Sequence, residues 1–184
     1  MLFASDIFGI SDAFLTLLKD VDIADNAINI SPYQQPQIHF ESEKQAYQCF
    51  QDHGGIDAYI LRLTDVLKSH QGIKHVVGFS AGAAALYKVM SNLSGNNIPL
   101  TLFYPGQIRY FLDKHPSSSC YIIFPESEPH FSLSDVIKVL KQQLPLTVDQ
   151  NGYQHGFMNF ESKGFDQTAY SHYCQMLQVL LANN

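Results

Sequence analysis

The strongest constraint on the fold lies in residues 74–87, which read KHVVGFSAGAAALY. A short β-branched run ends at Gly78, Ser80 follows two residues later, and Gly82 precedes small and apolar residues at helical spacing. This pattern predicts a strand, a sharp turn and a helix. Gly78-x-Ser80-x-Gly82 matches the nucleophile elbow, in which a serine occupies a strained turn between closely packed elements. Ser80 is therefore expected above the carboxyl edge of a sheet.

A three-residue match of this kind is weak by itself, because composition alone produces it in some chains. The alternative is a tight strand-to-helix turn that carries an ordinary serine. A serine at the start of a helix would lie beside backbone N–H groups and the positive end of the helix dipole, which stabilise a developing oxyanion. An acid and a histidine that follow in the right order would favour the chemical interpretation.

The length and charge of the chain bear on its number of domains and on the classes of partner it can bind. With 184 residues, the sequence predicts a single domain over residues 1–184 that can bury a sizeable core. The net charge of −6 and only 11 scattered Lys and Arg residues argue against a nucleic-acid partner. No apolar run has the length of a membrane span, and the start lacks the basic region of a secretory signal. We expect a cytoplasmic protein without a membrane partner.

The three cysteines, Cys49, Cys120 and Cys174, lie far apart and lack metal-ligand spacing. An odd number of scattered cysteines suits reduced thiols in a reducing compartment, and each is expected to behave as a small core residue. The histidines other than two that follow later strands are expected to be mostly solvated at the surface. They are residues 39, 53, 70, 75, 115 and 172.

Short apolar runs alternate with helical patterns along the whole chain. Strands are predicted at residues 2–5, 27–30, 73–78, 98–103, 121–124 and 146–148. Three helices are predicted from their start signals: one after the N-cap Ser11, one after the capping box Ser42-x-x-Gln45 that ends at Gly54-Gly55, and one after Ser132. Four more are predicted at 56–67, from the elbow to 92, near 106–112 and at 170–181. Continuous apolar strands alternating with helices predict an α/β fold: a doubly wound, mostly parallel sheet of about six strands with helices on both faces.

Ligands of such sheets bind outside the carboxyl ends of the strands. Ser80 follows the third strand, an acidic loop with Glu126 and Glu128 follows the fifth, and His155 follows the sixth. Serine, acid and histidine follow one another in the chain order of the α/β-hydrolase triad. An imidazole activates the serine hydroxyl, and a carboxylate orients the imidazole and stabilises its cation. The N–H groups of Ala81 and Ile7 are expected to bind the oxyanion.

The chain resembles the dienelactone hydrolase family of α/β-hydrolases over nearly its whole length. The matching segments are Asp6-Ile7-Phe8-Gly9, Ser31-Pro32-Tyr33, Gly78-Phe79-Ser80-Ala81-Gly82, Pro125-Glu126-Ser127-Glu128-Pro129-His130 and His155-Gly156-Phe157. The resemblance implies that Ser80, Glu128 and His155 are catalytic and that Ile7 and Ala81 form the oxyanion hole. It also places Asp6 beside the nucleophile.

The chain departs from the family pattern at three positions. Where members that open dienelactones have a cysteine nucleophile, an aspartate and an arginine, this chain has Ser80, Glu128 and Asn159. Serine with glutamate still forms a workable triad, whereas asparagine cannot bind a substrate carboxylate as arginine does. The chain also starts at the strand before the oxyanion loop, which predicts a small sheet, no cap domain and an open site.

The resemblance implies a serine hydrolase that acts on carboxylic esters or lactones through an acyl-enzyme and needs neither a metal nor a cofactor. The substrate pocket is expected to include Asp6, Phe8, Phe79 and His130. Two alternatives remain at the acidic loop. Glu126 could be the acid in place of Glu128, or Glu126, Glu128 and His130 could bind a metal ion.

Two further functions compete with ester hydrolysis. A non-catalytic protein with this fold could bind a small molecule or a partner, because a fold does not guarantee chemistry. The same site could transfer the acyl group to an alcohol or a thiol in place of water, since both reactions share the acyl-enzyme.

Overall fold

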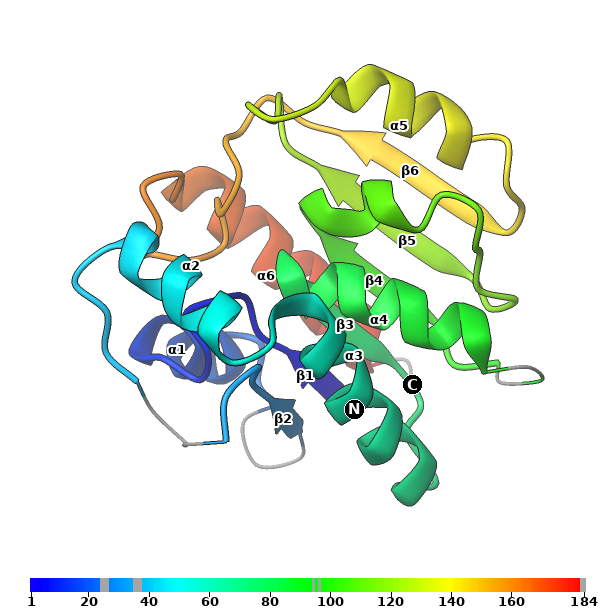
Figure 1. Ribbon diagram of the computed structural model, residues 1–184, viewed down its shortest axis with the longest axis horizontal. Helices are drawn as coiled ribbons and strands as arrows, with labels where there is room; N and C mark the ends of the chain where they lie inside the picture. The colour runs from blue at the N-terminus through cyan, green and yellow to red at the C-terminus, as the bar shows by residue number, and fades with distance from the viewer. Residues whose placement is uncertain (24–26, 35–37, 94, 96, 183–184) are drawn as a thin grey trace.

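Six parallel strands form one sheet in the order β2-β1-β3-β4-β5-β6 (Figure 1). The structure is a computed structural model that describes residues 1–23, 27–34, 38–93, 95 and 97–182. The chain leaves β1 toward β2 on one side and returns to β3 on the other side of β1. This change of direction opens a crevice outside the carboxyl ends of β1 and β3, where such sheets bind ligands.

The elements follow one another almost as the sequence predicts. The strands are β1 (Leu2–Ala4), β2 (Ile28–Ile30), β3 (Val76–Phe79), β4 (Leu100–Phe103), β5 (Cys120–Phe124) and β6 (Leu146–Gln150). The helices are α1 (Asp12–Asp20), α2 (Glu43–Asp52), α3 (Gly55–Ser69), α4 (Ala81–Asn92), α5 (Leu133–Leu140) and α6 (Gln167–Ala182), with the short 3₁₀ helix η1 (Gly106–Tyr110).

Helices cover both faces of the sheet, and each face has its own apolar core. On one face α3, α4 and α5 pack on the strands, and α2 joins this core near its edge (Figure 1). On the other face α1 and α6 pack on an aromatic core that includes Phe3, Phe79 and Phe103. Because side chains alternate along a strand, Val76 and Gly78 face α4 while Val77 and Phe79 face α1 and α6. The predicted doubly wound α/β fold is confirmed.

The edge strands differ from the buried runs that the sequence predicts. In β6 the side chains of Leu146 and Val148 are buried, while Thr147, Asp149 and Gln150 are exposed. Only one long edge of β6 pairs with a neighbour, and α5 covers one of its faces. Uninterrupted apolar sequence is therefore a property of the central strands.

The helix boundaries follow from local capping. The hydroxyls of Ser11 and Ser42 accept hydrogen bonds from the third residue of their helices, as expected of N-caps. Gly54 and Gly55 have positive φ angles and separate α2 from α3. Ser132 precedes α5, but its side chain makes no capping hydrogen bond.

One expected surface histidine is buried. His75 directly precedes β3, and its ring lies inside the core with only 3% of the residue exposed. Its Nε2 lies 3.0 Å from the hydroxyl of Thr101 in the neighbouring strand. The prediction was wrong because the pairing of β3 with β4 covers this position, which the sequence alone does not indicate. Within the described part of the chain, no helix is long and apolar enough to cross a membrane.

Candidate active site

Ser80 sits on the turn between β3 and α4, as the elbow motif predicts. Its φ and ψ angles are 49° and −113°, a region that non-glycine residues rarely adopt. Two backbone hydrogen bonds hold this turn: the Ser80 N–H donates to the Phe103 carbonyl at 2.9 Å, and the Ser80 carbonyl accepts from Ala84 at 3.1 Å. The neighbouring residues are buried, whereas Ser80 is partly exposed and its hydroxyl reaches the surface.

The two glycines of the motif allow the elements to approach closely. A Cβ atom at Gly78 would lie 2.7 Å from the Cα of Ala83 in α4. A Cβ atom at Gly82 would lie 2.7 Å from the Ala4 carbonyl oxygen at the end of β1. Both distances are shorter than real Cβ contacts, so side chains here would push α4 away from the sheet. The motif thus fixes the height of Ser80 above the carboxyl edge.

Ser80, His155 and Glu128 form a continuous chain of hydrogen bonds. The Ser80 Oγ lies 2.9 Å from Nε2 of His155, and Nδ1 of His155 lies 2.6 Å from Oε1 of Glu128. In the tautomer that fits both contacts, Ser80 donates to Nε2 and the Nδ1–H donates to the carboxylate. The side chain of His155 is 35% exposed and that of Glu128 only 7%, so the carboxylate is shielded while the imidazole faces the cavity.

The alternatives at the acidic loop have different positions in the structure. Glu126 is exposed, and its backbone N–H donates to the Tyr153 carbonyl at 2.7 Å. The carboxylate that contacts His155 belongs to Glu128. Glu126, Glu128 and His130 do not form a metal-binding group, and no such cluster of His, Cys, Asp or Glu occurs among the residues that the structure describes. The described residues thus give the metal alternative no support at this loop.

The sequence predicts that the backbone N–H groups of Ile7 and Ala81 bind the oxyanion. Ala81 is the first residue of α4, so its N–H has no partner within the helix. Ile7 lies in the loop after β1, and its N–H has no acceptor within the described part of the chain. Both residues line the same cavity as Ser80. The helix dipole of α4 adds positive potential at this point.

Asp6 precedes Ile7 in the loop after β1 and is 8% exposed. One carboxylate oxygen accepts the Phe8 N–H at 2.9 Å, and the other accepts the Asn159 side-chain amide at 2.7 Å. Burial raises the pKa of Asp6 to about 6, although these two hydrogen bonds and the nearby His155 act in the opposite direction. Asn159, which occupies the position of the family's arginine, is buried against Asp6 and takes no part in the open cavity.

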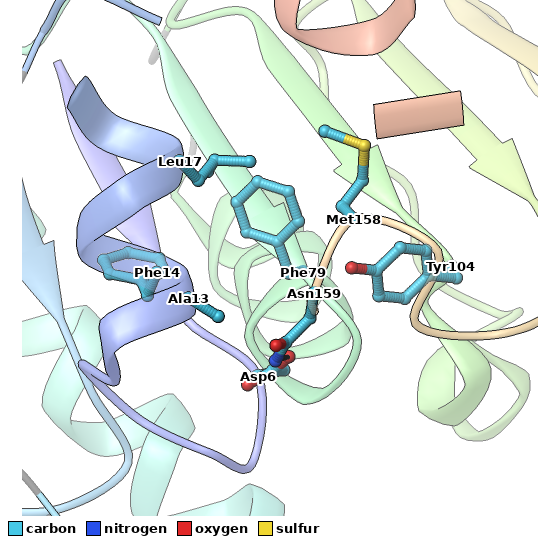
Figure 2. A pocket seen from close by; sticks show the side chains of 8 residues that line it. All are labelled: Asp6, Ala13, Phe14, Leu17, Phe79, Tyr104, Met158 and Asn159. Atoms are coloured by element: carbon cyan, nitrogen blue, oxygen red, sulfur yellow. Dashed lines mark hydrogen bonds between the residues drawn. The ribbon is translucent and has the colours of Figure 1, made fainter. Parts of the chain in front are cut away.

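A small internal cavity lies on the side of Asp6 that faces α1 (Figure 2). Its volume is about 10 Å³, and its walls include Asp6, Phe79, Tyr104 and Asn159. Tyr104 has a positive φ of 40°, is 1% exposed, and packs its ring 4.9 Å from the imidazole of His155. This aromatic contact restricts the orientation of the imidazole. Tyr104 is not among the residues predicted for the site, although its place directly after β4 is the signal that such sheets provide.

The larger cavity contains Ser80 and His155 and has a volume of about 730 Å³. Of the residues predicted for the substrate pocket, Asp6, Phe8 and His130 line it. Phe79 does not: it is stacked on Phe103 in the core between the sheet and α1 and α6, and it touches only the small internal cavity. The reason is the alternation of side chains along β3, which sends Phe79 to the face opposite α4.

Part of the cavity wall comes from elements that the sequence does not connect with the site. Helix α2 contributes Lys44 and Tyr47, and η1 contributes Gln107 and Arg109. The guanidinium of Arg109 stacks on the ring of Tyr110 at 4.3 Å, which fixes its orientation. No sequence signal marks α2 as a wall, because its position depends on the path of the chain between β2 and α3. The expected open site is thus partly bounded by α2.

Comparison with known proteins finds one similar sequence and several similar folds. No family profile matches the sequence. The chain is 31% identical over 136 residues to the uncharacterized protein YczH of Bacillus subtilis (strain 168); the match covers 71% of this chain and 65% of YczH, less than two thirds of that protein's length.

Solved structures share the whole architecture. The dienelactone hydrolase-like promiscuous phosphotriesterase P91 from metagenomic libraries is similar with a TM-score of 0.70 and 16% identity, over 99% of this chain and 84% of that one. A protein of Xanthomonas campestris pv. campestris assigned to the α/β superfamily of hydrolases is similar with a TM-score of 0.63 and 12% identity, over 100% and 98% of the two chains. The chain therefore has the fold of a dienelactone hydrolase-like α/β-hydrolase.

Proposed function

We propose that the chain is a dienelactone hydrolase-like serine hydrolase that cleaves carboxylic esters or lactones through an acyl-enzyme. The observation that carries the proposal is the unbroken hydrogen-bond chain from Ser80 through His155 to Glu128, at 2.9 and 2.6 Å. Each link joins a donor to an acceptor in the order that nucleophilic catalysis requires. The strained turn at Ser80 supports it, because strain concentrates at functional sites.

In the first half of the reaction the Ser80 hydroxyl attacks the carbonyl carbon of the ester. Nε2 of His155 takes the hydroxyl proton, and the Glu128 carboxylate stabilises the imidazolium through Nδ1. The carbonyl oxygen becomes an oxyanion that the N–H groups of Ile7 and Ala81 bind. Nε2–H then protonates the leaving oxygen, the C–O bond breaks, and Ser80 carries the acyl group.

In the second half a water molecule replaces the leaving group. Nε2 of His155, now neutral, takes a proton from the water, which attacks the acyl carbon and forms a second oxyanion in the same hole. Collapse of this intermediate returns the proton to the oxygen of Ser80 and releases the carboxylic acid. Acyl transfer differs only in that an alcohol or a thiol takes the place of this water.

The cavity favours a small substrate. Its volume of about 730 Å³ falls within the usual range for small-molecule sites, which is roughly 300 to 1,000 Å³. Asn159 is engaged with Asp6, so this position offers no cation to a substrate carboxylate. These features support short carboxylic esters or lactones. The three free cysteines support the accompanying proposal that the protein works in the reducing cytoplasm. The single sheet with a core on each face supports the proposal of one domain over residues 1–184.

A fluorophosphonate probe tests the proposal directly. We expect stoichiometric labelling of the wild-type protein and no labelling of the Ser80→Ala variant. Ser91→Ala is the matched control, because Ser91 lies on the same helix and its hydroxyl donates only to the Tyr87 carbonyl at 2.7 Å. A wild-type protein that stays unlabelled would support the non-catalytic binding protein instead. A chain-length series of p-nitrophenyl esters then defines the acyl group, and added alcohols or thiols reveal acyl transfer.

A further inference from the structure

The loop that carries the Ile7 N–H is held by hydrogen bonds at nearly every peptide group. The Asp6 carbonyl accepts from the Gly9 N–H at 3.1 Å and from the Ser5 hydroxyl at 3.2 Å. The Phe8 N–H donates to the Asp6 carboxylate at 2.9 Å. The Ile7 N–H has no acceptor among the described residues, and it lies between these fixed groups. A donor held in place by its neighbours and left without a partner is pre-organised to bind an acceptor.

Tyr33 holds the Ile7 carbonyl of this loop. Its hydroxyl donates to the Ile7 carbonyl, with 2.5 Å between the two oxygens. The side chain is 3% exposed, and it belongs to the segment Ser31-Pro32-Tyr33 after β2, to which the site described above assigns no role. The Tyr33 backbone is itself fixed, since its N–H donates to the Ser31 hydroxyl at 3.0 Å and its carbonyl accepts from Arg62 at 3.1 Å.

The Ile7–Phe8 peptide is therefore pinned at both ends. Its carbonyl is held by Tyr33, and its N–H is held by the Asp6 carboxylate. The preceding peptide is anchored through the Asp6 carbonyl. Because peptide groups are planar, fixing two adjacent planes fixes the backbone angles between them. Those angles determine where the Ile7 N–H points, so loss of the Tyr33 contact frees one of its two supports.

The hydroxyl of Tyr33 also connects this loop with α2. Its oxygen lies 3.2 Å from the Ala46 carbonyl in α2, but its single proton points to the closer acceptor at Ile7. Burial raises the pKa of Tyr33 well above its usual value, so the hydroxyl stays protonated and keeps donating at physiological pH. Gly9 completes the fit, because a Cβ atom there would lie 3.0 Å from the Tyr33 ring.

We propose that Tyr33 is a positioning residue of the oxyanion hole, which acts on the reaction by orienting the Ile7 N–H. This proposal rests on the proposed function, because it assumes that Ile7 binds the oxyanion. Tyr33 does not touch the reacting atoms; it acts through the Ile7–Phe8 peptide. The competing explanation is an ordinary core tyrosine whose hydroxyl satisfies a buried carbonyl and only supports stability.

The test compares Tyr33→Phe with the matched control Tyr87→Phe. Tyr87 is also buried and donates to a backbone carbonyl, that of Lys114 at 2.6 Å, but it lies outside the cavity. With p-nitrophenyl acetate we expect kcat of Tyr33→Phe to fall about tenfold while KM changes less than about twofold, since the oxyanion forms only in the transition state. We expect kcat of Tyr87→Phe to stay within about twofold of the wild-type value.

Hydrogen exchange of the Ile7 and Phe8 amides provides a second readout that needs no substrate. We expect the Phe8 amide to exchange at least about tenfold faster in Tyr33→Phe than in the wild type, and at an unchanged rate in Tyr87→Phe. An unchanged kcat in Tyr33→Phe, or equal losses in both variants, would overturn the proposal. If the wild-type protein neither hydrolyses esters nor binds the fluorophosphonate, the proposed function fails. Amide exchange then decides separately whether Tyr33 orders the loop, and unchanged Phe8 exchange contradicts it.

Discussion

The two ends of β3 use histidine in opposite ways. At the amino end His75 is buried, its Nε2 meets the Thr101 hydroxyl, and its Nδ1 has no hydrogen-bond partner. Burial lowers the pKa of His75 to about 4, so the ring is neutral at physiological pH. Beyond the carboxyl end His155 is partly exposed, accepts from Ser80 and donates to Glu128. The His75 ring resists protonation because it is buried, while the His155 ring has a hydrogen-bond partner at each nitrogen.

The difference lies in what surrounds each ring. Parallel strands deliver the residues that follow them to the same edge, so a serine, a carboxylate and an imidazole from β3, β5 and β6 meet there. The residues that precede the strands lie at the other edge, where His75 fits between β3 and β4. Chemistry is expected at the first edge, and a contribution to stability alone is expected at the second.

Loss of Ser80 or His155, the relay residues that exchange a proton in the proposed reaction, should have the largest effect on kcat. We expect Ser80→Ala and His155→Ala each to lower kcat for an ester by about four to six orders of magnitude, because members of one catalytic unit act together. His75→Gln should keep kcat within about threefold of the wild type. Steady-state assays with p-nitrophenyl acetate measure all three. Activity of either relay variant within tenfold of the wild type would contradict the assignment of the reaction to this edge.

Loss of the carboxylate of Glu128 should have the second largest effect on kcat. Glu128→Gln keeps the shape of the side chain but removes the charge that orients and stabilises the His155 imidazolium, and we expect kcat to fall by about two to four orders of magnitude. Glu126→Gln is the matched control, because Glu126 is exposed on the same loop and should leave kcat nearly unchanged. The opposite result for the two variants would assign the acid to Glu126.

The smallest effects concern the free energy of unfolding, to which Asp6 and His75, at opposite ends of the sheet, contribute with opposite pH dependence. The pKa of Asp6 is raised to about 6, so its contribution to stability is fully present below about pH 4 and is lost as pH rises through 6. The pKa of His75 is lowered to about 4, so its contribution is present above pH 6.5 and is lost as pH falls toward 4. Between pH 4 and 6.5 the two contributions change in opposite directions.

Single variants separate these contributions. On acidification from pH 6.5 to 4, the free energy of unfolding of Asp6→Asn should fall by about 2 kcal/mol more than that of the wild type, because the opposing group is gone. His75→Gln should fall by about 2 kcal/mol less. Urea denaturation at several pH values measures both slopes. Parallel curves for the wild type and Asp6→Asn would show that Asp6 titrates alike in the folded and unfolded protein.

The sequence alone predicts much of this molecule, and the reason is local. The central strands are short apolar runs, α1 and α2 begin at serine N-caps, glycines separate α2 from α3, and Gly78-x-Ser80-x-Gly82 specifies its own turn. The parallel order follows from the alternation of strands and helices. The chain order of serine, acid and histidine then predicts which loops meet, and the structure brings Ser80, Glu128 and His155 together.

The remaining features depend on contacts between distant segments. Neither the burial of His75 against β4 nor the place of Phe79 on the face opposite α4 is visible without strand register. The contact of Tyr33 with Ile7 joins residues 26 positions apart through a side chain. The position of α2 beside the cavity depends on the packing of the whole chain. Sequence periodicity carries no information about such encounters.

Helix α2 forms a wall of the cavity but supplies no residue to the hydrogen-bond chain. Its attachment includes a hydrogen bond of 2.8 Å that the Ser162 hydroxyl donates to the Glu43 carboxylate, and glycines separate it from α3. Lys44 and Tyr47 are both exposed on it. Under the proposed function, we expect substitutions at these two positions to alter which acyl groups are accepted while Ser80 stays intact, so this helix is the natural starting point for diversification of substrate range by evolution or by engineering.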